Sequence, residues 1–286
     1  MLSYRHAFHA GNHADVLKHT VLILLLDYLA QKPKPLLLAD THAGAGAYDL
    51  LGDYAQKSGE YTEGVLKLWN EKKLPEALAR YLEIVRATND DGALRYYPGS
   101  PAIADALLRD EDKLRLFEMH PTDLKLLQQN FARQRSGTRA RVQVAAGDGF
   151  DGLKSVLPPP SRRGLVLIDP AYELKTDYRR VVDALDEGLK RFATGVYAVW
   201  YPCLQRAESR QLPGDLRKLA ERHGVKGWLQ AEIAVDAIDG EGLKASGMFV
   251  LNPPWTLKAA LQESLPVMAR LLGQGPGAGW RLDGRE

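Results

Sequence analysis

Short apolar runs alternate with stretches of helical periodicity along most of this 286-residue chain. The first helical stretch begins at Asn12 or Asp15 and continues to about Ala30, with apolar residues at helical spacing. The first apolar run, PLLLAD, occupies residues 35–40 and ends in an acid. Near-continuous apolar runs of this kind are typical of strands that are buried on both faces of a parallel sheet. The beginning of the chain therefore predicts an α/β fold.

Four more apolar runs continue the alternation, namely KLRLFEM, ARVQVAA, GLVLID and GVYAVWYP. Helices are predicted after these runs at residues 121–132, from Asp148 onward, and at residues 176–192 and 212–223. The last two runs, GWLQAEIAV and SGMFVLN, have no helix between them, so we expect an antiparallel hairpin. The pattern thus predicts a doubly wound, seven-stranded, mostly parallel sheet with an antiparallel terminal hairpin.

Two segments fall outside this alternation. Residues 52–95 contain two helical patterns, EYTEGVLKLWNEK and PEALARYLEIVRA, between the first and second strands. We interpret them as a helical subdomain inserted into a single domain that spans residues 1–286. The last 14 positions, residues 273–286, begin with GQGPGAGW, and this glycine-rich composition predicts a flexible C-terminal tail.

Composition and charge narrow the class of protein. A net charge of +2 is too small to indicate a nucleic-acid-binding protein by itself. The single cysteine, Cys203, excludes an intramolecular disulfide and fits a reducing cytoplasm. The polar, histidine-rich N-terminus is unlike a signal peptide, and the apolar stretch TVLILLLDYLA is interrupted by Asp27 and too short to span a membrane. We therefore expect a soluble cytoplasmic protein without membrane association.

Acidic residues stand at the ends of four successive predicted strands: Asp40, Glu118, Asp148 and Asp169. Ligands of doubly wound sheets bind outside the carboxyl ends of the parallel strands, so these positions are candidate ligand contacts. The alternative for any single acid is a helix N-cap, and for Asp148 taken alone the N-cap is the favoured interpretation. The series of four favours a nucleoside-containing cofactor, with Glu118 accepting hydrogen bonds from a ribose diol and Asp148 from an adenine amine.

The turn after the first strand, THAGAG, indicates which cofactor. Gly44 and Gly46 would let the backbone approach a ligand closely. The third glycine of the dinucleotide-binding fingerprint is missing, because position 49 is Asp. S-adenosylmethionine therefore fits better than NAD.

The fourth strand ends in DPAY, residues 169–172, which is suited to chemistry on an exocyclic amine. The Asp169 carboxylate and the Pro170 carbonyl can accept the two amine hydrogens, so that the nitrogen lone pair points at a methyl donor. Tyr172 can stack on the base. A similar segment, NPPW at residues 252–255, follows the last strand of the hairpin. Because that strand is antiparallel, we predict that NPPW lies at the opposite edge, starts the last helix and buries Trp255.

Several motifs together carry a family resemblance: YRHAFHAGNHADVLKH, DTHAGAG, YYPGSP, SRRGLVLIDPAY, KRFATG and ASGM with NPPW. They resemble the RlmJ family of bacterial adenine-N6 methyltransferases, which act on large-subunit (23S) ribosomal RNA. The resemblance extends from Leu2 to about Trp255. It implies a Rossmann-like class I methyltransferase fold, S-adenosylmethionine as cofactor and 23S rRNA as partner. We expect a monomer that uses no metal.

The resemblance also implies roles for individual residues. Cofactor contacts are implied for His19, His42, Ser100, Glu118, Asp148 and Gly149, in addition to Gly44 in the glycine turn. Asp169 would be the catalytic acceptor, supported by Pro170 and Tyr172. Substrate contacts are implied for Tyr4, His6 and Lys18, which share the N-terminal motif. Four histidines in the first 19 residues match no standard zinc spacing, so we interpret this segment as a flap over cofactor and RNA.

One position departs from the family pattern, because Ala171 stands where the family carries a second proline. The lost stiffness of the loop is worth about 0.4–1 kcal/mol, so we predict a retained but slower activity. Basic residues of the insertion, Lys67, Lys72, Lys73 and Arg80, form a candidate RNA surface. Two other functions are consistent with the sequence: methylation of an amine in DNA or protein, and non-catalytic RNA binding with an impaired loop.

Overall fold

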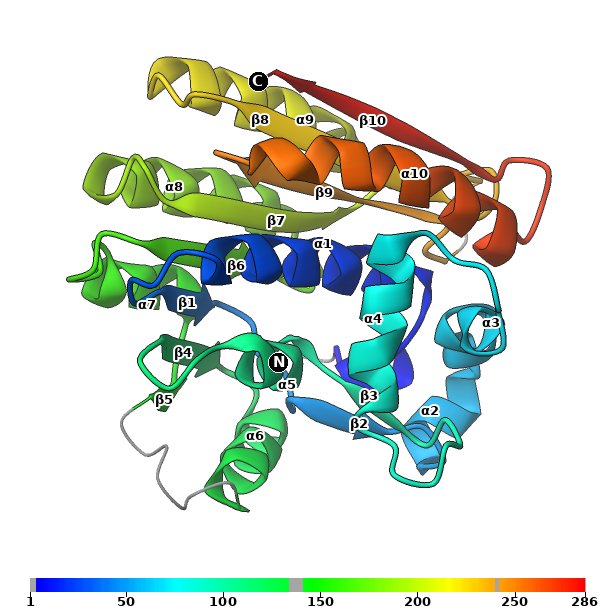
Figure 1. Cartoon of the computed structure of the whole chain (residues 1–286). Coiled ribbons are helices and arrows are strands. Elements are labelled where there is room, and N and C mark those ends of the chain that lie inside the picture. The colour runs from blue at the N-terminus through cyan, green and yellow to red at the C-terminus, as the bar shows by residue number, and fades with distance from the viewer. Residues whose placement is uncertain (1–3, 134–140, 240–241, 286) are drawn as a thin grey trace.

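The computed structural model describes residues 4–133, 141–239 and 242–285 (Figure 1). Eight strands of these residues form one sheet in the order β10-β8-β9-β7-β6-β1-β4-β5. Five of them are parallel, as predicted: β1 Leu37–Asp40, β4 Lys113–Glu118, β5 Val142–Ala146, β6 Gly164–Ile168 and β7 Val196–Pro202. The other three are antiparallel to their neighbours: β8 Trp228–Ala234, β9 Ala245–Leu251 and β10 Gly279–Arg285. The predicted hairpin of β8 and β9 is confirmed.

Strand β10 corrects two predictions, the seven-stranded sheet and the flexible tail at residues 273–286. All seven residues of β10 pair with β8. The glycines before it serve close packing: a Cβ on Gly277 would lie 2.1 Å from the backbone nitrogen of Ala237, and one on Gly275 would lie 2.2 Å from the Asp236 carboxylate. The glycine-rich composition therefore reflects a tight turn onto the sheet edge.

Helices cover both faces of the sheet (Figure 1). One face carries α1 His13–Ala30, α4 Glu76–Arg86, α5 Ser100–Leu107 and α10 Trp255–Leu272, and the other carries α7 Gly149–Val156, α8 Lys175–Arg191 and α9 Ala207–Arg222. Alternate residues of a strand point to opposite faces, so Leu165 and Leu167 of β6 join the first core while Val166 and Ile168 join the second. This two-faced burial explains the continuous apolar runs.

The first helix begins where the sequence predicts. The Asn12 side chain caps α1 by accepting hydrogen bonds from the backbone nitrogens of Ala14 and Asp15, both at 3.0 Å. Buried polar side chains occupy its first two turns, and Asp15, Lys18 and His19 are each at most 5% exposed. Buried charges need partners, so this end of α1 is a candidate for function.

The insertion forms short elements: α2 Asp53–Ser58, η2 Glu60–Glu63, α3 Val65–Trp69 and α4. They lie between β2 Ala47–Asp49 and β3 Tyr96–Pro98, two short strands that pair with each other where the sequence predicted only a turn and a loop. Buried Leu78, Tyr81 and Leu82 of α4 pack into the same core as α1.

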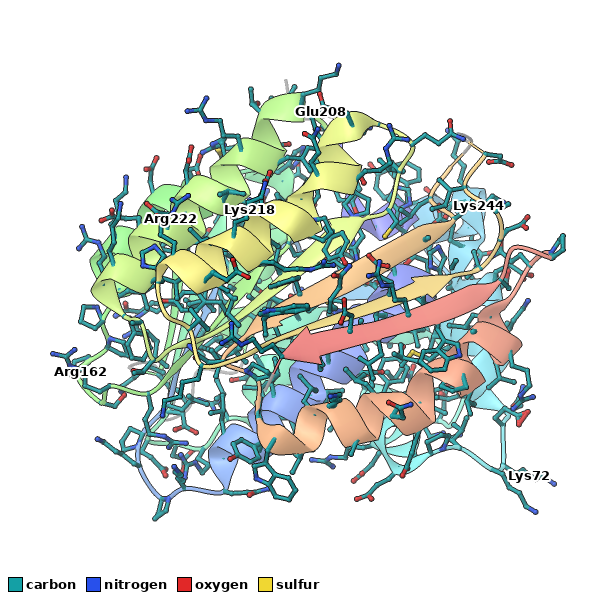
Figure 2. The ribbon with its side chains drawn as sticks, turned by 90° about the horizontal axis from the view of Figure 1, so that it is seen from above. Lys72, Arg162, Glu208, Lys218, Arg222 and Lys244 are labelled. Carbon is teal, nitrogen blue, oxygen red and sulfur yellow. The ribbon has the colours of Figure 1, made fainter. Side chains whose placement is uncertain are left out.

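The basic residues of the insertion are unequally placed for RNA. Arg80 Nε lies 3.0 Å from Asp27 Oδ2, and Lys67 is paired with Glu63, so both charges are compensated within the protein. Lys72, in the loop between α3 and α4, projects away from the helices (Figure 2). The remaining short elements are η1 His6–Phe8, before α1, and α6 Pro121–Arg133, after β4.

The NPPW segment lies where strand direction predicts. Leu251, the last residue of β9, pairs with Tyr197 near the start of β7, so Asn252 lies at the sheet edge opposite to the end of β6. Pro254 is the N-cap of α10, which confirms the predicted helix start. The predicted burial of Trp255 is wrong, because its side chain is 77% exposed. It is the first residue of α10 and precedes Leu257, the first buried residue of that helix.

Candidate active site

One cavity of about 1160 Å³, counting space open to solvent, lies at the carboxyl ends of the parallel strands. Of the candidate site residues singled out in the sequence, Asp40, Gly46 and Tyr172 do not line it, and the following do: Tyr4, His6, Lys18, His19, His42, Gly44, Ser100, Glu118, Asp148, Gly149, Asp169 and Pro170. The strand ends thus bring together residues that are far apart in the sequence. This is the position expected for the ligand site of a doubly wound sheet.

Glu118, the last residue of β4, is locked against the glycine turn. Its Oε2 accepts a hydrogen bond from the Gly44 nitrogen at 2.8 Å, and its Oε1 accepts one from the His120 nitrogen at 2.6 Å. Burial raises the Glu118 pKa above its usual value. Gly44 has a φ of +61°, and a Cβ there would lie 2.4 Å from the Tyr48 hydroxyl oxygen. A side chain at position 44 would therefore disturb the turn that holds Glu118.

Asp148 serves both as a helix cap and as a cavity residue. Its Oδ1 accepts a hydrogen bond from the Phe150 nitrogen at 2.9 Å, so the N-cap interpretation is confirmed. Its Oδ2 is paired with Arg180 of α8, whose guanidinium lies 4.7 Å from the centre of the Phe150 ring. Burial lowers the pKa of neighbouring His42 to about 4, so that imidazole is neutral. Sequence reasoning missed Arg180, because no local pattern links α8 to the acid before α7.

Asp40 is the one strand-end acid that does not line the cavity. It is fully buried and accepts hydrogen bonds from the Ser100 hydroxyl at 2.6 Å and from the His42 nitrogen at 3.2 Å. Burial raises its pKa to about 6. Asp40 therefore orients two cavity residues and is not itself placed to contact a ligand.

Asp169, just after β6, is held by a buried lysine. Lys18 Nζ donates to Asp169 Oδ2 at 2.7 Å and lies 2.8 Å from Asp15 Oδ1. Burial raises the Asp169 pKa, and the charge of Lys18 opposes that rise. Burial alone would lower the Lys18 pKa, but the carboxylates of Asp15 and Asp169 outweigh it and raise that pKa above its usual value. Lys18 is therefore an ammonium shared between the side chains of Asp15 and Asp169.

Asp15 extends this network to the N-terminal segment. Its Oδ2 accepts a hydrogen bond from the Gly11 nitrogen at 2.8 Å and lies 2.9 Å from His6 Nε2. The Tyr4 hydroxyl in turn lies 2.8 Å from His6 Nδ1. A continuous polar chain thus runs from Tyr4 through His6, Asp15 and Lys18 to Asp169. The sequence marked Asp15 only as a possible helix start, because its partners become visible only in the folded chain.

The structure corrects the predicted position of Tyr172. Its side chain is 2% exposed, and its hydroxyl donates to the Trp200 carbonyl oxygen at 2.7 Å. The ring packs against Tyr178, with 4.7 Å between ring centres. A φ of +51° at Tyr172 turns the chain at this point, and the ring joins the core beneath α8. The ring therefore offers no stacking face to the cavity. It packs in the core under the loop that begins at Asp169.

The chemistry of the donor set fits a nucleoside cofactor. The buried His19 ring holds the Tyr97 hydroxyl at 2.7 Å from Nδ1, while its Nε2 has no hydrogen-bond partner among the described residues. Burial lowers the His19 pKa to about 3, so this unpaired nitrogen belongs to a neutral ring. Together with Glu118 and the Gly44 turn, it supplies polar groups for a ribose and for a second polar part of the same ligand.

Two further properties concern metals and membranes. Within the described ranges, no three His, Cys, Asp or Glu side chains gather closely enough to hold a metal ion. In the same part of the chain, no helix is long and apolar enough to cross a membrane.

Comparison with known proteins identifies the family. The family described as "Ribosomal RNA large subunit methyltransferase D, RlmJ" matches residues 33–284. The "Ribosomal RNA large subunit methyltransferase J" of Escherichia coli (strain K12) is 51% identical over 279 residues, covering 97% of this chain and 96% of the relative. The protein of that name from Haemophilus influenzae is 47% identical over 286 residues, covering 99% and 98% of the two chains.

A solved structure agrees with this assignment. The crystal structure of a Legionella pneumophila protein shares 34% sequence identity and superposes with a TM-score of 0.85, covering 96% of this chain and 98% of that one. Family match, sequence identity and fold all extend over nearly the whole chain. The chain therefore belongs to the RlmJ family of ribosomal RNA large subunit methyltransferases.

Proposed function

We propose that this chain transfers a methyl group from S-adenosylmethionine to the N6 amine of an adenosine in 23S ribosomal RNA, which it meets in the cytoplasm. The observation that carries the proposal is the shared cavity. Asp169 and Pro170 line the same space as Glu118 and the Gly44 turn, so an acceptor for an amine faces the groups suited to a nucleoside cofactor. Family membership supplies the substrate class.

The cofactor contacts follow from the cavity. Glu118 and Gly44 would hold the ribose, and Asp148, Gly149 and His42 would hold the adenine. We assign His19 and Ser100 to the remaining polar part of the cofactor. When bound, S-adenosylmethionine supplies a sulfonium-activated methyl group. The residues of the chain bind the cofactor, orient the target amine and exclude water from the cavity.

Asp169 has the central role toward the target amine. Because Lys18 occupies its Oδ2, we assign Oδ1 to accept one amine hydrogen and the Pro170 carbonyl to accept the other. This arrangement points the nitrogen lone pair at the methyl group. The charge of Lys18 favours the ionised form of this buried carboxylate, and Asp169 is the acceptor we assign for the proton that leaves after methyl transfer.

The N-terminal segment would contact the substrate base. Tyr4 lines the cavity and is only partly buried, whereas the Tyr172 ring is enclosed in the core. We therefore assign stacking on the target adenine to Tyr4. His6 would orient the Tyr4 hydroxyl, to which it lies within hydrogen-bond distance.

The test uses radiolabelled S-adenosylmethionine, unmodified large-subunit rRNA and two enzymes, wild type and Asp169→Ala. After incubation the RNA is digested to nucleosides. We expect label in N6-methyladenosine with wild type and loss of at least about 100-fold with Asp169→Ala, the size of effect seen when one preorganised polar group is removed. Parallel incubations replace the rRNA with DNA or with protein, and label there instead would support a different amine substrate. Cofactor binding without transfer to any RNA would support a non-catalytic RNA-binding protein.

A further inference from the structure

An exposed leucine stands at the rim of the active-site cavity. Leu174 lines the cavity, and its side chain is 63% exposed. Leu185 and Leu189 of the following helix α8 are, by contrast, at most 1% exposed. Burial of an apolar side chain is what stabilises a fold, so Leu174 contributes little to the stability of this one.

The backbone nevertheless holds Leu174 in a defined place. Its nitrogen donates to Asp177 Oδ2 at 3.1 Å, and its carbonyl oxygen accepts a hydrogen bond from the Asp177 nitrogen at 3.0 Å. These reciprocal bonds form the N-terminal cap of α8. The loop that begins at Asp169 therefore ends in a fixed cap that presents an apolar side chain at the cavity rim.

The depth of Asp169 requires the substrate to enter the cavity. The Asp169 side chain is 14% exposed, and that of Lys18 beside it is 6% exposed. An adenine stacked and paired in a duplex cannot bring its amine to a carboxylate this deep, so the base must leave the stack. Extrusion leaves a gap in the helix, and proteins that open base steps commonly fill such gaps with an apolar side chain.

Two side chains have the right chemistry and position. Among the residues that the structure describes, Met119 and Leu174 are the large aliphatic side chains that are exposed and also line the cavity, at 47% and 63% exposure. Met119 follows Glu118 on the side assigned to the cofactor. Leu174 belongs to the same loop as Asp169, on the side where the target base must enter.

Two exposed cations follow Leu174 in the sequence, next to the acids Glu173 and Asp177. Lys175 and Arg179, in the first turns of α8, have side chains that are 77% and 87% exposed. Lys175 Nζ lies 3.6 Å from a Glu208 carboxylate oxygen, and Arg179 Nε lies 3.6 Å from one of Asp183. Such exposed ion pairs are weak, so both cations can exchange their partners for phosphates.

We propose that Leu174 is the wedge that enters the space vacated by the target adenine when it is extruded from a paired RNA helix. This inference rests on the proposed function, because it takes an adenosine in RNA as the substrate. It adds a substrate-positioning residue that acts on the RNA helix and not on the reacting amine.

The test compares two RNA fragments that carry the methylated adenosine, once mapped, within a stem. One fragment has uridine opposite the target, and the other has an abasic site there. We expect Leu174→Ala to lower kcat/KM at least about tenfold on the paired RNA and less than about twofold on the abasic RNA, because only the paired base resists extrusion. Leu174→Met, which keeps a long apolar side chain, should restore most of the activity.

The matched control is Leu51→Ala, since Leu51 is 58% exposed and lies outside the cavity. It should change neither rate. Unchanged affinity of Leu174→Ala for S-adenosylhomocysteine would establish that its cofactor site is intact. Equal losses on both RNAs, or no loss on the paired RNA, would overturn the wedge. Failure of the wild type on both RNAs would overturn the proposed function itself, and the wedge with it.

Discussion

Residues 169–172 and 252–255 have nearly the same sequence pattern but lie at opposite edges of the sheet. Each segment follows a buried strand with an acid or amide and then proline, and each contains a residue of positive φ, Tyr172 at 51° and Asn252 at 52°. The first follows a parallel strand and opens into the cavity. The second follows an antiparallel strand and lies at the other edge of the sheet. Strand direction, not the motif, decides which segment can meet a cofactor.

The polar groups of the two segments also differ in what holds them. Asn252 Nδ2 donates to the carbonyl oxygens of Ala193 at 2.9 Å and Gly195 at 2.8 Å, so the amide fixes the turn before β7. Asp169 is held by the side chain of Lys18. Both contacts of the Asn252 amide are to backbone carbonyls, whereas Lys18 occupies only Oδ2 of Asp169 and leaves Oδ1 for a substrate. Asn252 is therefore structural, and Asp169 is available for chemistry.

The largest expected difference between the two segments is in the rate of RNA methylation. Asp169→Ala should lower kcat for RNA methylation at least about 100-fold, because it removes the preorganised acceptor. Asn252→Ala should leave kcat within about twofold of wild type, as expected for a residue remote from the reaction. Initial rates at saturating cofactor, measured for both variants in parallel, check this. Equal losses in the two variants would refute the distinction between the segments.

Next in size is the contrast between two tyrosines. Tyr172→Leu should lower the free energy of unfolding by about 2 kcal/mol or more, because it truncates a buried ring, while the KM for RNA changes little. Tyr4→Leu should lower the free energy of unfolding by only about 1 kcal/mol, the worth of its hydrogen bond to His6, and raise the KM for RNA by the equivalent of about 1–3 kcal/mol of lost stacking. Urea unfolding and steady-state kinetics separate the two effects. The reverse pattern would restore Tyr172 as the stacking residue.

A third test concerns the stability of the second segment. Asn252→Ala removes two hydrogen bonds to backbone carbonyls, so the free energy of unfolding should fall by about 1–3 kcal/mol. Trp255→Ala is the matched control, because its 77%-exposed side chain should contribute no more than about 0.5 kcal/mol. Urea denaturation of both variants measures these losses. A larger loss for Trp255→Ala than for Asn252→Ala would contradict the structure.

The pH dependence of turnover sharpens the comparison further. Asp169 accepts an amine hydrogen only as a carboxylate, so kcat should fall as the pH drops through its raised pKa. Lys18 lowers that pKa, and Lys18→Gln should therefore move the acid limb of the kcat profile to higher pH. Asn252→Ala should retain the wild-type profile. A limb that stays in place or moves to lower pH in Lys18→Gln would show that another group controls it.

The smallest expected effect lies within the first segment itself. Ala171 lines the cavity beside Pro170, where a second proline would stiffen the loop. Ala171→Pro should raise turnover several-fold, in line with a proline effect of about 0.4–1 kcal/mol. Single-turnover rates of the two enzymes measure it, with cofactor affinity as the control. An unchanged rate would refute the stiffness argument.

Much of the candidate site could be predicted because its residues follow strands. Once the alternation of strands and helices is recognised, the rule for parallel sheets places Glu118, Asp148 and Asp169 at one edge. No comparable rule predicts the contacts of the site residues that sequence analysis missed. Arg180 meets Asp148 from a helix 32 positions away, and Asp15 was visible only as a candidate helix start. Pairing between side chains on different elements leaves no periodic trace in the sequence.

The sequence by itself determined the order of the elements, the strand that ends in Asp169 and the reason why NPPW lies at the opposite edge of the sheet. These follow from local periodicity and from strand direction, which neighbouring residues encode. Only the tertiary structure decided that β10 pairs with β8, that Lys18 meets Asp169 across 151 positions, and that the Tyr172 ring is buried. Such contacts depend on how elements distant in the sequence pack together. That packing depends on interactions throughout the core, which no single segment encodes.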